Sequence, residues 1–212
     1  MKLVVGAATD VGRVRDGNVD SFLAAAVADG MGGHRGGEVA SATALEALRA
    51  AASSGRPLRD AIEEANRAVF TKSVSDPALR GMGTTLTAGT LAAGGTLLIG
   101  HVGDSRAYLL RDGELSQVTT DHSLVEELVR EGRITASEAA VHPQRSIITR
   151  ALGPEAKVEI DTFTRRARPG DVYLLCSDGL TTMLGEKGIE IGRASCRERC
   201  TVLCRSRWSP YH

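Results

Sequence analysis

The sequence predicts an α+β fold built mainly from antiparallel strands. Short apolar runs outnumber the helical stretches, and four of these runs form two hairpins along the middle of the chain. The order is two strands, two helices, four strands, two helices and two strands, which differs from the strict alternation of parallel α/β proteins. At 212 residues the chain is long enough for one domain with a sizeable core.

The first half of the chain divides into strands and helices by its apolar spacing. Residues 2–8 and 22–28 are continuous apolar runs and predict buried strands, separated by a polar loop over residues 10–20. Apolar residues recur at helical spacing from 38 to 52, which predicts a first helix. A second helix is predicted over 57–72, with Pro57 in its first turn.

The second half contains two hairpins, two short helices and a final pair of strands. Residues 84–91 and 96–102 pair around Gly94-Gly95, and residues 107–111 and 114–118 pair around Asp112-Gly113. Helices are predicted over 123–132 and 135–141, the second beginning with a capping box in which Thr135 and Glu138 are partners. Strands over 158–163 and 171–176 follow.

Charge and hydropathy exclude several classes of function. The formal net charge is zero, which argues against a nucleic-acid partner. No apolar stretch is long enough to cross a bilayer, and the N-terminus is too short and polar for a signal peptide. We therefore expect a cytoplasmic monomer without membrane contact.

The composition changes near Gly192. Residues 193–212 contain five Arg and one Glu, three of the four cysteines, and Trp208 as the one tryptophan. The spacing of those cysteines matches no common zinc site, and the segment has no apolar period. We predict a domain over residues 1–185 and a non-native tail over 186–212.

Three predicted strands end on an aspartate beside glycine. Asp29 precedes Gly30, Asp104 follows Gly103, and Asp178 precedes Gly179. Such ends deliver carboxylates and bare carbonyls to the edge of a sheet, and hard divalent cations prefer these oxygen ligands. The pattern predicts a metal site, whereas Asp112-Gly113, which joins the two strands of a hairpin, is expected to be only a turn.

Seven motifs in order resemble the metal-dependent protein phosphatases of the PPM (PP2C) type, in their bacterial form. They cover residues 2–185 and lie at 10–20, 28–34, 37–41, 81–85, 103–106, 142–146 and 176–180. The resemblance implies a β-sandwich of two antiparallel sheets flanked by helices, with a metal centre at one end. It also implies that the helical insert near residues 121–150 is a flap beside this centre.

The family's reaction is the hydrolysis of phosphoserine and phosphothreonine in proteins by a water that two metal ions activate. The resemblance implies that Asp29 bridges the two ions and that Gly30 offers its carbonyl to one of them. Asp178 would bind the other ion, Asp20 would hold metal-bound waters, and Asp104 would share a third ion position with Asp178. Oxygen ligands of this kind suit Mn²⁺ or Mg²⁺.

Two further residues are candidates for the phosphoryl chemistry. Arg15 is the candidate phosphate clamp, because its planar guanidinium can meet two phosphoryl oxygens at once. His34 is a candidate general acid, although it lies three residues beyond the position that eukaryotic relatives use, where this chain has Met31.

The chain departs from the family pattern at two places. Val19 stands where the family has Glu, and after Gly185 nothing matches the closing strands and the Asp-Asn pair whose aspartate is a metal ligand. We therefore expect a sandwich that lacks its C-terminal strands, with weak metal affinity and little activity.

Three functions stay open at this point. The first is a phosphatase that opposes a bacterial Ser/Thr kinase and acts on that kinase's phosphorylated substrates. The second is a catalytically inactive phosphatase-like domain that binds partners or regulates them. The third is a phosphatase that acts on an anti-sigma-factor antagonist.

Overall fold

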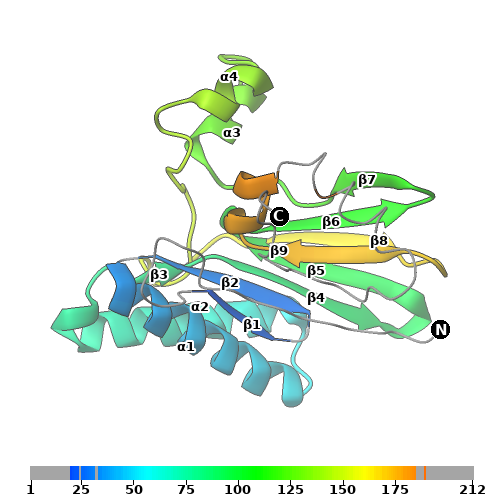
Figure 1. The fold of residues 1–212 in the computed structure, drawn as a ribbon. Coiled ribbons are helices and arrows are strands. Elements are labelled where there is room, and N and C mark those ends of the chain that lie inside the picture. The colour runs from blue at the N-terminus through cyan, green and yellow to red at the C-terminus, as the bar shows by residue number, and fades with distance from the viewer. Residues whose placement is uncertain (1–19, 24, 32, 185–188, 190–212) are drawn as a thin grey trace, which may run out of the picture.

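The computed structural model describes residues 20–23, 25–31, 33–184 and 189. Within them, a large antiparallel sheet has helices on one face and a small antiparallel sheet on the other (Figure 1). No helix of this part of the chain is both long and apolar enough to cross a membrane.

The large sheet carries the candidate metal ligands of the first half of the chain. Its strand order is β1 (Asp20–Leu23), β2 (Ala26–Met31), β4 (Leu86–Ala92), β5 (Thr96–Val102) and β8 (Asp161–Arg166). The short strand β3 (Gly83–Thr84) pairs with the end of β2. Every pairing is antiparallel.

Two helices cover one face of this sheet, α1 (Gly33–Ser53) and α2 (Leu58–Ser75) (Figure 1). The core between them and the sheet is rich in alanine, with Ala28, Ala40 and Ala65 fully buried. Small side chains allow the α1 backbone to approach β2 closely. Asn66 is a buried polar residue in this core, and its amide bonds the backbone of the loop at residues 153–156.

The small sheet packs on the opposite face and completes the sandwich. Its order is β7 (Glu114–Gln117), β6 (Arg106–Arg111) and β9 (Val172–Cys176). Ile99 of the large sheet and Leu109 of the small sheet belong to the core between the two layers. Residues 178–184 are helical and follow β9 directly.

A helical insert leaves the sandwich after β7. It holds α3 (Leu124–Arg130) and α4 (Ala136–Val141), which project from the rest of the molecule (Figure 1). The two ends of the insert meet in a short backbone neck: Thr149 N–H donates to the His122 carbonyl at 2.8 Å and Leu124 N–H donates to the Ile147 carbonyl at 3.0 Å. The predicted capping box of Thr135 and Glu138 is present at the start of α4.

The predicted α+β class and the two antiparallel sheets are confirmed. The single strand expected over 22–28 is wrong, because the chain reverses there: Leu23 pairs with Ala26, and Ala25 adopts a φ of 70°. Nothing in an alanine run signals this turn, since alanine seldom takes a positive φ. The last strands begin later than predicted, at Asp161 and Val172. The strand predicted over 2–8 and the tail lie outside the described residues.

Candidate metal centre

The hairpin of β1 and β2 places two aspartates opposite one another. Asp20 pairs in register with Asp29, so these two acidic residues lie directly across from each other on neighbouring strands. Like charges at directly opposite positions of a sheet repel one another. A divalent cation at this end of the hairpin would meet an aspartate position on each of the two strands.

Two threonines hold the backbone of Asp29 in place. Thr85 Oγ1 accepts the Asp29 N–H at 2.9 Å, and the Asp29 carbonyl accepts both Thr85 N–H and Thr84 Oγ1 at 2.9 Å. Thr85 Oγ1 also lies 2.7 Å from the Ser105 hydroxyl. A chain of hydrogen bonds therefore joins the Asp29 strand end to the residue that follows Asp104.

Gly30 occupies a position that tolerates no side chain. A Cβ on it would collide with the Gly37 carbonyl of α1, and a Cβ on Gly37 would lie 2.7 Å from the Gly30 oxygen. The N-terminal part of α1 thus packs backbone to backbone against the predicted metal-binding carbonyl. Gly30 is needed for this packing whether or not its carbonyl binds an ion.

Asp104 and Asp178 lie within electrostatic reach of one another. Burial, together with the negative charges of Asp178 and Asp121, raises the pKa of Asp104 to about 6. A carboxyl group whose pKa is raised by a neighbouring carboxylate lies in an environment that a divalent cation would stabilise. Asp178 begins the helical segment that follows β9, as its predicted strand-end position requires.

Arg106 neutralises one of these neighbouring charges. Its Nε and Nη2 donate to the Asp121 carboxylate at 2.9 and 2.7 Å, a bidentate pair, and its Nη1 donates to Tyr108 Oη at 3.0 Å. Burial alone would lower the pKa of Arg106, but the bonds to Asp121 outweigh it and raise that pKa. Asp121 is thereby engaged by arginine, which leaves Asp104 and Asp178 as the pair whose charge repulsion a metal ion would relieve.

A buried histidine pair lies behind the Asp104 turn. The rings of His101 and His122 are 4.8 Å apart, and both side chains are almost fully buried. Burial and the neighbouring His122 lower the pKa of His101 to about 4, and burial also lowers the pKa of His122. His122 Nε2 lies 3.2 Å from Asp161 Oδ2, and Arg150 Nη1 lies 3.0 Å from Asp161 Oδ1.

The structure places the Asp20 backbone opposite that of Asp29, and it places Asp178 near enough to Asp104 to raise the pKa of Asp104. Within the described residues, no three side chains of His, Cys, Asp or Glu form one group that could hold a metal. A single centre that includes Asp29, Asp104 and Asp178 therefore stays a prediction. Arg15 and the side chain of His34 lie outside the described part, although His34 itself falls in the first turn of α1.

The sequence patterns do not reveal the residues that support the predicted ligands. Thr84, Thr85 and Ser105 lie within the family motifs but have no distinctive spacing, and His101 and His122 are 21 residues apart and form a pair only in the folded chain. The one available signal was the position of Thr85 and Ser105 next to glycine-flanked strand ends.

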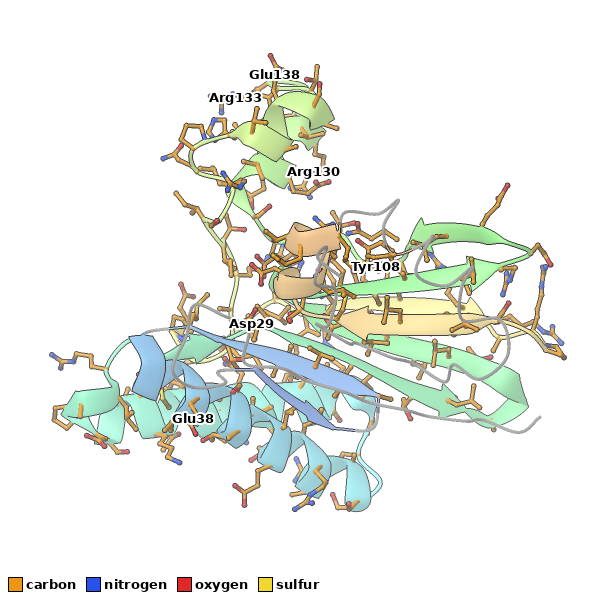
Figure 2. The ribbon with its side chains drawn as sticks, viewed as in Figure 1. Asp29, Glu38, Tyr108, Arg130, Arg133 and Glu138 are labelled. Carbon is orange, nitrogen blue, oxygen red and sulfur yellow. The ribbon has the colours of Figure 1, made fainter. Side chains whose placement is uncertain are left out.

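The insert carries charged residues that Figure 2 shows well away from Asp29, among them Arg130, Arg133 and Glu138.

The model of the family described as "Protein phosphatase 2C" matches residues 10–200. The chain belongs to the protein phosphatase 2C family. It is 49% identical over 194 residues to the serine/threonine protein phosphatase PstP of Mycobacterium tuberculosis, covering 86% of this chain and 37% of PstP. It is 44% identical over 201 residues to the serine/threonine phosphatase stp of Listeria monocytogenes, covering 86% of this chain and 79% of that protein.

A solved structure extends the likeness to the metal chemistry of the family. The catalytic domain of PstP in complex with two manganese ions superposes with a TM-score of 0.74 at 45% identity, covering 85% of this chain and 79% of that one. The chain spans about a third of the length of full PstP but most of its catalytic domain. Divalent metal ions thus belong to the chemistry of this PP2C family, and the carboxylate pairs described above have the oxygen donors that such ions prefer.

Proposed function

We propose that this PP2C domain hydrolyses phosphoserine and phosphothreonine in proteins and that its carboxylates hold two divalent metal ions. The observation that supports this most directly is the pair of facing acidic positions, Asp20 opposite Asp29, at the end of the hairpin beside Gly30. The raised pKa of Asp104 beside Asp178 is a second sign of charge that a cation would neutralise.

Each predicted site residue has a specific role in this proposal. When bound, the two ions would supply a water that loses its proton near neutral pH and would neutralise the phosphoryl oxygens. Asp29 would bridge the ions, the Gly30 carbonyl and Asp178 would each bind one of them, and Asp20 would orient bound waters. Arg15 would clamp the phosphate by two hydrogen bonds.

Two finer points extend the proposal. Asp104 and Asp178 would share a third ion position, and His34 would donate a proton to the leaving hydroxyl. We propose phosphorylated proteins as the substrates, with those of a Ser/Thr kinase as the first set to test. The monomeric state and the cytoplasmic location stay predictions.

The decisive experiment is a metal-dependent phosphatase assay with a matched set of aspartate variants. Turnover of p-nitrophenyl phosphate and of a phosphothreonine peptide is measured with Mn²⁺ and with EDTA. Asp29→Asn and Asp178→Asn should each lower kcat at saturating Mn²⁺ by at least about a hundredfold, because each removes a charged metal ligand. Asp112→Asn is the control, since Asp112 also precedes a glycine but lies in the exposed β6–β7 turn with a φ of 53°.

A chimera separates the chemistry of the site from the effect of the tail. In it, residues 186–212 are replaced by the corresponding segment of PstP. We expect weak turnover by the chain as printed and stronger Mn²⁺-dependent turnover by the chimera. Turnover that persists in EDTA, or equal loss in Asp112→Asn, would contradict the proposal. A chimera that binds Mn²⁺ and a phosphopeptide without hydrolysing it would favour the inactive binding domain.

A further inference from the structure

We propose that His122 is a positioning residue for Asp104: as a neutral ring that Asp161 orients, it fixes the Gly103–Asp104 turn at the metal centre. This inference rests on the proposed role of Asp104 as a metal ligand. His122 lies at the neck of the insert and belongs to none of the motifs that identify the family.

Two hydrogen bonds join His122 to the residue before Asp104. His122 N–H donates to the Gly103 carbonyl at 2.8 Å, and Gly103 N–H donates to His122 Nδ1 at 3.1 Å. Both polar groups of the Gly103 backbone are therefore held by one residue. Gly103 has a φ of 108°, a conformation that few other residues adopt, so this turn has a defined shape that the two bonds preserve.

The opposite side of the turn is held by Thr87 of β4 and by Thr85, the residue before this strand. A Cβ on Gly103 would lie 2.6 Å from Thr85 Cγ2, so the glycine packs directly on that threonine. Thr87 Oγ1 donates to the Ser105 carbonyl at 2.7 Å, and Thr85 Oγ1 meets the Ser105 hydroxyl. The turn thus lies between the Thr85–Thr87 segment and His122. Without the His122 ring, one side of it would lose its side-chain support.

The bond from Gly103 decides the protonation of the ring. A backbone N–H can only donate, so Nδ1 of His122 must be the unprotonated, accepting nitrogen. The proton of the neutral ring then resides on Nε2, where Asp161 Oδ2 accepts it at 3.2 Å. Arg150 Nη1 also lies 3.2 Å from Nε2, but a guanidinium cannot donate to a protonated nitrogen, so the hydrogen-bond partner of Arg150 here is Asp161.

Asp161 therefore acts on the turn through His122. It lies at the start of β8, its carboxylate accepts from His122 and Arg150, and these bonds lower its pKa although burial opposes the shift. A carboxylate that binds one ring nitrogen sets the tautomer and orientation of a histidine whose other nitrogen has a task at a metal centre. In this protein that task is performed on the backbone beside a ligand rather than on the ion.

Nitrogen NMR of the folded protein gives a first test that needs no variant. At neutral pH in EDTA, the ¹⁵N shifts of His122 should report a neutral ring protonated at Nε2. A ring protonated at Nδ1, or at both nitrogens, would overturn the inference, because the Gly103 N–H would then have no acceptor. This measurement does not depend on phosphatase activity.

Two variants separate the two ends of the ring. In His122→Asn the amide oxygen can take the place of Nδ1 and accept from Gly103, whereas in His122→Gln the amide nitrogen takes the place of Nε2 and reaches Asp161. Loss of a group that supports a metal ligand typically weakens metal binding by 10–100-fold. We expect His122→Gln to weaken Mn²⁺ binding about tenfold and His122→Asn to retain most of it.

A double-mutant cycle with Asp104→Asn distinguishes positioning from general damage to the fold. Because His122 acts through Asp104, His122→Gln should have no further effect on Mn²⁺ binding in the Asp104→Asn background. An equal loss in both backgrounds, or tighter binding by His122→Gln than by His122→Asn, would overturn the inference. Mn²⁺-dependent turnover by the unmodified chimera shows separately whether the proposed function itself holds.

Discussion

Replacing Gly37 by alanine tests the close packing of α1 against the predicted metal-binding carbonyl. The new Cβ would lie 2.7 Å from the Gly30 oxygen and 2.8 Å from its carbon, and both atoms belong to the backbone and cannot rotate away. Added volume of this kind in a packed core costs about 1–3 kcal/mol. The helix must shift, and the Gly30 carbonyl must move with it.

Gly36→Ala is the matched control. It lies on the same helix, and its Cβ would lie 3.4 Å from Met82 Cβ, close to an ordinary contact. Both variants gain a similar helix propensity, up to about 1 kcal/mol, so the difference between them isolates the collision. Urea unfolding in EDTA should show Gly37→Ala to be less stable than Gly36→Ala by about 1–3 kcal/mol, or roughly 2–12 °C in Tm. Equal stabilities would refute the argument.

Three further predictions concern buried polar groups. Asn66→Ala should lower the free energy of unfolding by about 2–4 kcal/mol, because one backbone N–H and two carbonyls of the 153–156 loop lose their hydrogen-bond partner. Chemical denaturation measures this change, and an unchanged midpoint would contradict the prediction. The folded-state pKa of Asp104 is raised from 3.8 to about 6, so in EDTA stability should fall as the pH rises through that window, and Asp104→Asn should remove the slope. Arg111 lowers the pKa of Asp171 to about 2, so the stability gained from this carboxylate is present above about pH 4 and is lost as the pH falls toward 2. In Asp171→Asn the free energy of unfolding should lose this acid-dependent component. A pH profile of stability equal to that of the unmodified protein would disprove the pairing.

Much of the fold could be predicted because local signals agreed with tertiary structure. The Asp112-Gly113 turn and the capping box of Thr135 and Glu138 each specify their own geometry, and both are present. The β1–β2 hairpin was missed because Ala25 turns the chain without any turn residue. Its conformation follows from the pairing of β1 with β2, which the local sequence does not encode.

The candidate site likewise has residues that the sequence predicts and residues that it does not. Asp29, Asp104 and Asp178 could be predicted as metal ligands because each lies at the end of an apolar run beside a glycine. Their supports could not, because Thr85 and His122 reach the site from other elements and look like ordinary polar residues in the sequence. The clash between Gly30 and Gly37 is likewise visible only once α1 is packed on β2.

The neck of the insert has a consequence for how such a domain can diversify. Because His122–Thr149 and Leu124–Ile147 close it with backbone hydrogen bonds, residues 125–146 begin and end at nearly the same place. The entropic contribution to the free energy of closing such a segment rises by only about 0.6 kcal/mol when its length doubles. The segment can therefore be lengthened, shortened or exchanged, and the strands of the sandwich would keep their pairing register and the positions of their aspartates.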